Sequence, residues 1–271
     1  MSAAHPPASR KEFPYWLAAA IAIALAIAIF VAANDLYSQV FTIVARGLGI
    51  TIFVTVVGFA LASALGLGIA LMALSDSRVL RQTARFYVEI IRGVPILVLL
   101  FWIAFAGVPG FVAAWNWATA PLAQAGIIEP LLVRDISLLW RAVVALTIGY
   151  SAFISEVFRA GIQSVETGQV EAAKALGLSR FQRFRLIVMP QALRTILPPL
   201  GNDFVAMVKD SSLVSVLGVA DITQMGKVYA AGSFRFFETY SIVAYIYLLL
   251  TVTLSLALRA LERKLRKGTH E

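Results

Sequence analysis

The chain has 271 residues, of which 60% are hydrophobic and 14% are charged, and its mean hydropathy is +0.83. Soluble domains contain about 45–50% apolar and about 25% charged residues, so this composition excludes an ordinary globular enzyme and a disordered protein. Cysteine is absent and the two histidines, His5 and His270, lie at the termini, which argues against disulfides, thiolate metal sites and a buried histidine centre.

Uncharged runs predict four membrane spans in an all-α integral membrane protein. Crossing about 30 Å of hydrocarbon takes about 20 helical residues, and the runs at 15–33, 47–75, 94–111 and 239–258 fit that length. The third run belongs to a longer uncharged stretch that contains Pro109 and Pro121. We expect this stretch to continue beyond residue 111 as an irregular outer segment, because proline interrupts helices.

Two more spans are predicted although they carry charges. Residues 138–158 hold Arg141 near one end and Glu156 near the other, and residues 194–220 hold Asp203, Lys209 and Asp210. The total is therefore six transmembrane helices. The first run also resembles a cleavable signal peptide, but its apolar region exceeds the usual 7–15 residues, so we favour a retained helix.

Small residues recur at every fourth position of the second span. One set is Gly58, Ala62, Gly66 and Ala70, and a second set beside it is Ala60, Ala64 and Gly68. A spacing of four places each set on one helical face, where small side chains allow close packing of helices in lipid.

The basic residues predict the orientation. Lys and Arg concentrate before the first span, in the loops 76–92 and 159–194, and in the C-terminal tail, whereas the alternate loops carry few. The positive-inside rule then places both termini in the cytoplasm. Loop parity thus accounts for the net charge of +8, and we expect no nucleic-acid partner.

The loop 159–194 has a helix–turn–helix pattern. A short helix is predicted over 168–176, with Gly177 as its left-handed end, and Ser179 with Gln182 forms a capping box for the next helix. That second helix is basic and amphipathic, and Pro190 is expected to break it before the chain re-enters the membrane. The pattern alone fits either a docking element or a connector lying on anionic lipid.

Several motifs resemble those of ABC importer permeases. The spacing of the loop residues resembles the EAA loop of that group: Glu171, Ala172, Ala173, Gly177, Ile187 and Pro190. Three further segments resemble the family of polar amino acid permeases, for histidine, glutamate, glutamine, arginine and opines: Arg92 to Pro95, Ser155 to Ile162, and Asn202 with Lys209 to Leu213. Val94 and Met189 depart from the usual Thr and Leu.

The resemblance covers 44–265 and implies a five-helix type I permease core. Residues 1–43 would add a cytoplasmic N-terminus and one extra helix, and 266–271 a basic cytoplasmic tail. It implies two permeases, identical or paralogous, a pair of ATP-binding cassette subunits and an extracytoplasmic solute-binding protein. The setting would be the bacterial cytoplasmic (inner) membrane, the substrate a polar amino acid, and the mechanism alternating access.

In this family the EAA helix couples the permease to its ATPase. The resemblance implies that Glu171 makes a polar contact, that Ala172 and Ala173 allow close docking, and that Gly177 forms the turn. Arg180, with Arg183 and Arg185, would add charge contacts. The chain has no phosphate-binding P-loop, so it is not itself an enzyme and holds no cofactor; ATP and magnesium would bind the partner.

The charges in 194–220 have two open interpretations. A charge facing lipid at mid-bilayer costs about 2.5–3.5 kcal/mol, so this side must face protein or water. It either lines the substrate path or forms a structural network; the path residues would be Asn202, Lys209, Asp210, Ser211 and Ser212. An ion-coupled secondary transporter or channel is the alternative function, and it would need no ATPase.

The remaining family motifs are expected to be structural. Glu156 and Arg159 lie near the cytoplasmic end of their span, where we expect them to anchor the helix. Arg92 and Pro95 belong to the segment that resembles the RGTP motif of the family, and we assign no chemistry to them.

Overall fold

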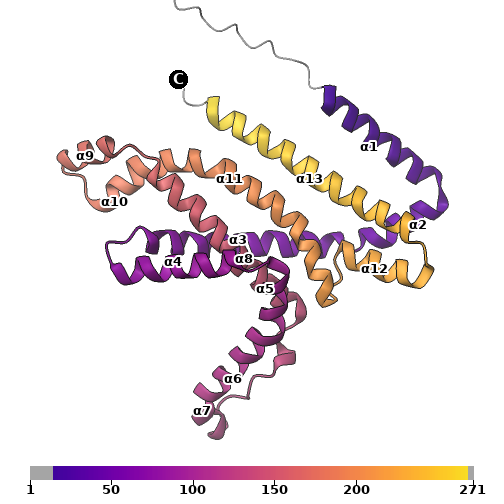
Figure 1. The fold of residues 1–271 in the computed structure, drawn as a ribbon, viewed down its shortest axis with the longest axis horizontal. Coiled ribbons are helices and arrows are strands. Elements are labelled where there is room, and N and C mark those ends of the chain that lie inside the picture. The colour runs from indigo at the N-terminus through magenta and orange to yellow at the C-terminus, as the bar shows by residue number, and fades with distance from the viewer. Residues whose placement is uncertain (1–14, 268–271) are drawn as a thin grey trace, which may run out of the picture.

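The computed structural model describes residues 15–267, and within that range every regular element is a helix (Figure 1). The first four are α1 (Tyr15–Ala33), α2 (Asp35–Ala45), α3 (Leu48–Ala73) and α4 (Arg78–Gly93). The others are α5 (Ile96–Trp102), η1 (Ile103–Gly107), α6 (Val108–Ala118), α7 (Ala120–Gln124), η2 (Val133–Asp135), α8 (Leu138–Gln163), α9 (Thr167–Ala175), α10 (Arg180–Arg183), η3 (Phe184–Val188), α11 (Met189–Asp210), η4 (Ser211–Leu217), α12 (Ile222–Ser233) and α13 (Phe236–Lys267). His5, His270, Arg10, Lys11 and most of the predicted tail at 266–271 lie outside the described residues.

Helices lie at all six predicted span positions. Four segments are long and apolar enough to cross a membrane, namely Asp35–Ala73, Ile96–Ala118, Leu138–Gln163 and Phe236–Arg263. The apolar part of α1 is shorter, and α11 carries the predicted charges. The all-helical membrane fold is thus confirmed, while the crossing of α1 and α11 stays a prediction.

The first helix packs on the rest of the chain. Val31 is buried in a cluster with Val40 of α2 and Ile242 of α13. The Tyr245 hydroxyl donates to the Ala24 carbonyl at 2.9 Å. These contacts give α1 a packing role in the folded chain, although they do not test whether it is cleaved.

The centre of the fold is the packing of α3 against α8. Ala62 and Ala70 are fully buried, and a Cβ on Gly66 would lie 3.0 Å from both an Ile154 methyl and the Ser151 carbonyl oxygen. The close packing predicted for the first set of small residues is therefore confirmed. The second set, Ala60, Ala64 and Gly68, is exposed on the isolated chain, so its packing role is not realised within this subunit.

Two prolines predicted to break helices do not break them. Pro109 follows the π-helical turn η1, and Pro190 follows the π-helical turn η3. In each case the wider turn bonds an N–H to the carbonyl five residues back, as from Val108 to Ile103. The helix can then absorb a residue that lacks an N–H and would clash with the preceding turn. The expected break at Pro190 is thus wrong. The expected irregular segment is present, but it begins after α7, at residues 125–132, and not at 112.

The predicted span 194–220 is displaced and shortened. α11 begins earlier, at Met189, and gives way at Ser211 to the 3₁₀ helix η4, which ends at Gly218 with φ of 78°. The Ser211 hydroxyl donates to the Val208 carbonyl at 2.7 Å, which fixes it to the backbone three residues back.

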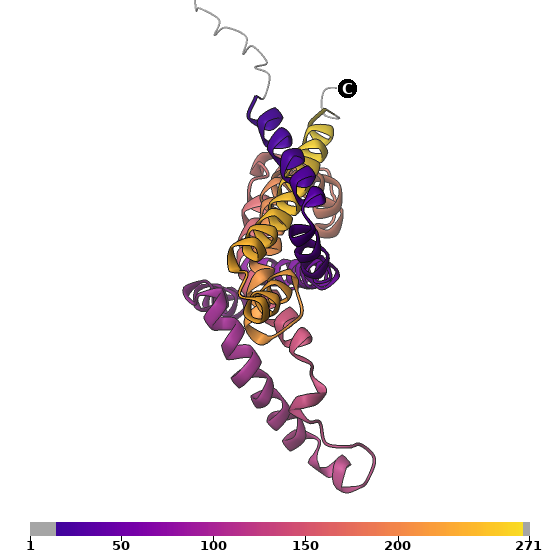
Figure 2. The ribbon, with the colours of Figure 1, turned by 90° about the vertical axis from the view of Figure 1, so that its right-hand side faces the viewer.

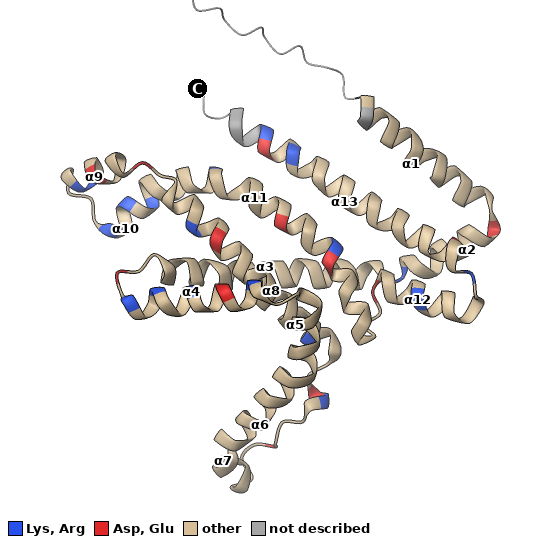
Figure 3. Ribbon diagram, viewed as in Figure 1, with Lys and Arg blue, Asp and Glu red and all other residues tan. Residues whose placement is uncertain are grey.

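The predicted loop 76–92 is mostly the amphipathic helix α4. Its small face, Ala84 and Val88, packs with Ile69 of α3. Figure 3 shows that charges cluster at one end of the molecule, around α4, α9 and α10, and are sparse along the central helices. At the other side, α5, α6 and α7 form an arm that projects from the helical body (Figures 1 and 2).

Candidate functional site

The turn between α9 and α10 has the predicted geometry. Gly177 adopts φ of 79°, and its N–H donates to the Lys174 carbonyl at 3.0 Å. The Leu178 N–H donates to the Ala173 carbonyl at 3.1 Å, which completes a helix end of the Schellman type. The predictions of a short helix over 168–176 and of a left-handed Gly177 are confirmed.

The second helix of the loop starts as predicted. The Ser179 hydroxyl accepts from the Gln182 N–H at 3.3 Å, and the Gln182 side chain accepts from the Ser179 N–H at 2.9 Å. Both orphan donors of the helix start are satisfied by this reciprocal pair. The two helices are therefore joined by a turn that is fixed on both sides.

The loop is also fastened to α11. Val165, before α9, is buried with Val188, Ala192 and Ile196. The Gln191 amide donates to the Gln169 side chain at 2.6 Å. Val170 of α9 packs against this cluster, so α9 and α11 share one apolar contact.

The outward surface of α9 differs in one respect from the expectation. Glu171 and Ala172 are exposed and Leu176 is 80% exposed, but Ala173 is only 4% exposed. Ala173 is turned toward its own chain, so it cannot offer the docking contact assigned to it by resemblance. The exposed surface at this point includes Glu171, Ala172 and Leu176.

The other loop residues occupy two environments. Arg180 lies 3.7 Å from Asp76, but both side chains are about nine-tenths exposed, and such pairs contribute little. Ile187 is half-buried in η3, where its carbonyl accepts from Gln191 at 3.0 Å. Pro190 is exposed at the start of α11.

The proposed substrate-path residues have different neighbours in the structure. The carboxylate of Asp210 faces α8 and accepts from the Tyr150 hydroxyl at 2.7 Å. Lys209 instead lines a cavity of about 270 Å³ between α11 and α13. Asn202 is exposed. Ser211 is fully buried, and its hydroxyl donates to the Val208 carbonyl.

Ser212 is the remaining proposed path residue, and Asp203 is the remaining predicted charge of this span. Ser212 is half-buried at the start of η4, and its carbonyl accepts from the Ser215 hydroxyl at 2.7 Å. Asp203 is also half-buried, and one of its oxygens has no partner within the described residues.

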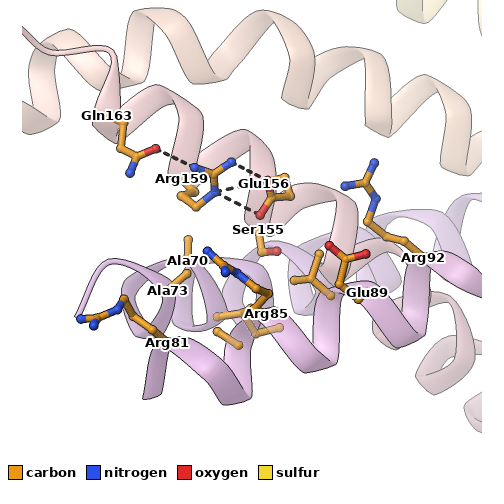
Figure 4. A pocket seen from close by; sticks show the side chains of 13 residues that line it. Ala70, Ala73, Arg81, Arg85, Glu89, Arg92, Ser155, Glu156, Arg159 and Gln163 are labelled. Carbon is orange, nitrogen blue, oxygen red and sulfur yellow. Dashed lines mark hydrogen bonds and ion pairs between the residues drawn. The ribbon is translucent and has the colours of Figure 1, made fainter. Parts of the chain in front are cut away.

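The family-motif residues meet at a different cavity. Arg159 donates to Glu156 at 2.7 Å and to Gln163 at 2.6 Å, as Figure 4 shows. Across from this pair lies Arg92, whose guanidinium stands 5.4 Å from the centre of the Phe153 ring. Pro95 follows the end of α4 and caps α5, and the extended Val94 before it is the conformation that proline imposes.

Sequence reasoning missed three residues of this cavity and one partner of Asp210. Arg81, Arg85 and Glu89 line the cavity from α4. Their spacing of four was visible, but the segment was interpreted as a loop. Tyr150 lies sixty residues from Asp210 in the sequence, and no local sequence pattern predicts such a contact.

The fold and the loop define the transmembrane component of a type I ABC importer. The chain belongs to the family described as binding-protein-dependent transport system inner membrane component, whose model matches residues 62–267. In this family ATP is hydrolysed on a separate subunit. A phosphate-binding P-loop contains a Gly-Lys pair. The one Gly-Lys pair of this sequence, Gly226-Lys227, lies inside helix α12 and not in a loop.

The chain is similar to named permeases and to solved transporters. It is 36% identical to the glutamine transport system permease protein GlnP of Escherichia coli (strain K12), over 82% of this chain and 92% of that one. It is 35% identical to the probable amino-acid permease protein YxeN of Bacillus subtilis (strain 168), over 82% and 91%.

A crystal structure of an amino acid ABC transporter with histidines matches with 37% identity and a TM-score of 0.68. The match covers 84% of this chain and 95% of the chain in that structure. The MetNI methionine ABC transporter matches with 20% identity and a TM-score of 0.64, over 86% of this chain and 99% of that one. At this identity the match supports the fold alone.

Proposed function

We propose that this chain is the permease subunit of an importer for polar amino acids. The observation that carries the coupling part of the proposal is the pre-formed loop, with an exposed α9 surface and a fixed turn at Gly177. The substrate class rests on the similarity to permeases named for glutamine and, in Rhizobium radiobacter, octopine, the latter at 36% identity over 78% of this chain.

Three partners complete the proposed transporter. A pair of ATP-binding subunits docks on the α9 surface formed by Glu171, Ala172 and Leu176. A second permease, identical or paralogous, packs on this one. An extracytoplasmic binding protein delivers substrate at the opposite face, and both termini of the permease are cytoplasmic.

The proposed mechanism is alternating access driven from outside this chain. Closure of the ATP-binding dimer displaces α9, and the apolar cluster of Val188, Ala192 and Ile196 transmits the displacement to α11. α11 carries Asn202, Lys209 and Asp210, with Ser211 and Ser212 at its end, so its movement changes the exposure of these polar groups. They would pair with the carboxylate and ammonium of the amino acid during passage.

The test is co-purification from native membranes. The tagged chain is solubilised in detergent, and ATPase activity of the eluate is measured with and without a glutamine-loaded binding protein. We expect a P-loop subunit in the eluate and higher activity with the loaded binding protein. A chain that elutes alone and moves amino acids in liposomes on an ion gradient would establish the secondary-transporter alternative instead.

A further inference from the structure

The cavity between α4 and α8 has an excess of basic side chains, and these side chains have no role in the proposed transport cycle. It measures about 410 Å³ and is lined by four arginines, two glutamates and smaller residues (Figure 4). The arginines are Arg81, Arg85, Arg92 and Arg159, and the glutamates are Glu89 and Glu156. The lining therefore carries a formal excess of two positive charges.

Internal pairing removes only part of this charge. Glu156 is neutralised by Arg159, which donates to it through both Nε and one terminal nitrogen. Arg81 uses one terminal nitrogen for the Ser75 and Asp76 carbonyls, at 2.7 and 2.8 Å, and keeps its full charge. The side chain of Arg85 has no hydrogen bond or ion pair to another described residue, and it lies in the cavity beside the Glu156–Arg159 pair (Figure 4). A guanidinium with free donors is thus directed at an open cavity.

The surroundings of the cavity indicate the kind of anion. α4 exposes a second, apolar face beside its arginines, in which Val79, Phe86 and Ile90 are each at least half exposed. The cavity also lies toward the end of the molecule that carries α9 and α10, as the contact of Arg180 with Asp76 at the start of α4 shows. Basic pockets between transmembrane helices at the cytoplasmic side are suited to phosphate head groups, and acyl chains can cover the adjoining apolar face.

We propose that this cavity binds a phosphate group, held by Arg85 and Arg92 with Arg81 at the rim, and that an anionic phospholipid carries it. Arginine suits this task because its planar fork donates two parallel bonds to phosphate oxygens. The proposal depends on the chain's place in the membrane and not on which substrate it transports.

The experiment compares Arg85→Gln and the double variant Arg85→Gln/Arg92→Gln with wild type, in the assembled transporter. Complexes are reconstituted in nanodiscs of phosphatidylcholine with or without phosphatidylglycerol, extracted, and analysed by native mass spectrometry for retained phosphatidylglycerol. We expect retention to fall about tenfold in the double variant, from the loss of charge-assisted bonds. Arg85→Lys should retain intermediate binding, which shows that a loss in Arg85→Gln is not misfolding.

Arg78→Gln is the matched control, because Arg78 lies on the same helix but outside the cavity lining. Equal retention in wild type and the double variant, or an equal loss in Arg78→Gln, would overturn the site. Inorganic phosphate is added to delipidated complex in a separate arm. If phosphate binds in an Arg85-dependent way and phosphatidylglycerol does not, the phosphate site stands and the lipid carrier is wrong. If glutamine binds there and neither phosphate form does, the assignment of an anion site is wrong.

Discussion

The turn at Gly177 is governed by the backbone of one residue. Its φ of 79° lies in the left-handed region, and a Cβ there would meet no atom within 4 Å. A substitution therefore acts through the backbone conformation and not through a clash. For ordinary residues this conformation costs about 1–2 kcal/mol, whereas Asn adopts it more readily.

We accordingly expect Gly177→Val to loosen the α9–α10 turn and Gly177→Asn to preserve it. The measurement is the amount of ATP-binding subunit retained on the tagged permease, with thermal unfolding recorded in parallel. Val should lower retention severalfold while Asn stays near wild type. Equal retention for the two variants would show that the left-handed turn is not needed for docking.

Asp210 depends on a partner far away in sequence. The Tyr150 hydroxyl donates to its carboxylate at 2.7 Å. Tyr150→Phe keeps the ring and removes the donor, so the half-buried carboxylate loses a bond at a cost of about 1–3 kcal/mol. We expect a lower melting temperature in detergent.

The double variant Tyr150→Phe/Asp210→Ala, compared with each single variant, provides the control for this contact, because alanine removes the acceptor. If the two groups act as a pair, the stability losses of the single variants should not add up in the double variant. Full additivity would mean that the two side chains act independently.

These residues also show which contacts can be predicted from the sequence. The capping box of Ser179 and Gln182 and the end at Gly177 involve neighbours within a few positions, so their patterns are legible in the sequence. The contact of Tyr150 with Asp210 depends on how α8 and α11 are placed side by side. No periodicity records that placement.

At the scale of elements, the uncharged runs predict α1, α3, the segment from α5 to α6, and α13, but not where each helix ends or becomes irregular. Pro109 and Pro190 looked like helix breakers because each lacks an N–H. The π-turns before them, η1 and η3, keep the helices continuous. A widened turn has no clear signature in composition, so the sequence could indicate the proline but not how the helix accommodates it.

The contact between α3 and α8 offers a test with an internal control. Gly66 faces α8, where a Cβ would lie 3.0 Å from two groups, and Gly68 faces open space. Gly66→Ala should destabilise the protein by about 1–3 kcal/mol, through overpacking. Gly68→Ala should be neutral or slightly stabilising, because alanine favours helix more than glycine does. Thermal melts in the same detergent decide, and equal effects at both sites would contradict the assigned packing face.

At the scale of the whole molecule, charge is concentrated where the chain is expected to meet the cytoplasm. Figure 3 shows this end formed by α4, α9 and α10. Loop parity made that concentration predictable. What the parity could not reveal is that residues 76–92 fold into the helix α4, which places three arginines beside the Glu156–Arg159 pair. One end of the molecule thus combines the proposed docking loop with a basic cavity.

The docking role of that end predicts a separation of effects across the molecule. Leu176 is 80% exposed on α9, and Leu176→Asp places a charge in an interface that would bury it. We expect the amount of ATP-binding subunit retained on the permease to fall at least about tenfold. A tenfold fall corresponds to a loss of about 1.4 kcal/mol of binding free energy, which one interface anchor can contribute. The permease itself should still insert and purify, because Leu176 contributes little to its own core.

The control is Ala125→Asp, which adds the same charge to an exposed position after α7, on the projecting arm. Its ATP-binding subunit should be retained as in wild type, because the arm lies far from α9 in Figure 1. An equal loss in both variants would mean that added charge, and not the α9 surface, disturbs assembly. Full retention in Leu176→Asp would place the docking contact elsewhere on the loop, with the exposed side chains of α10 as the next surface to change.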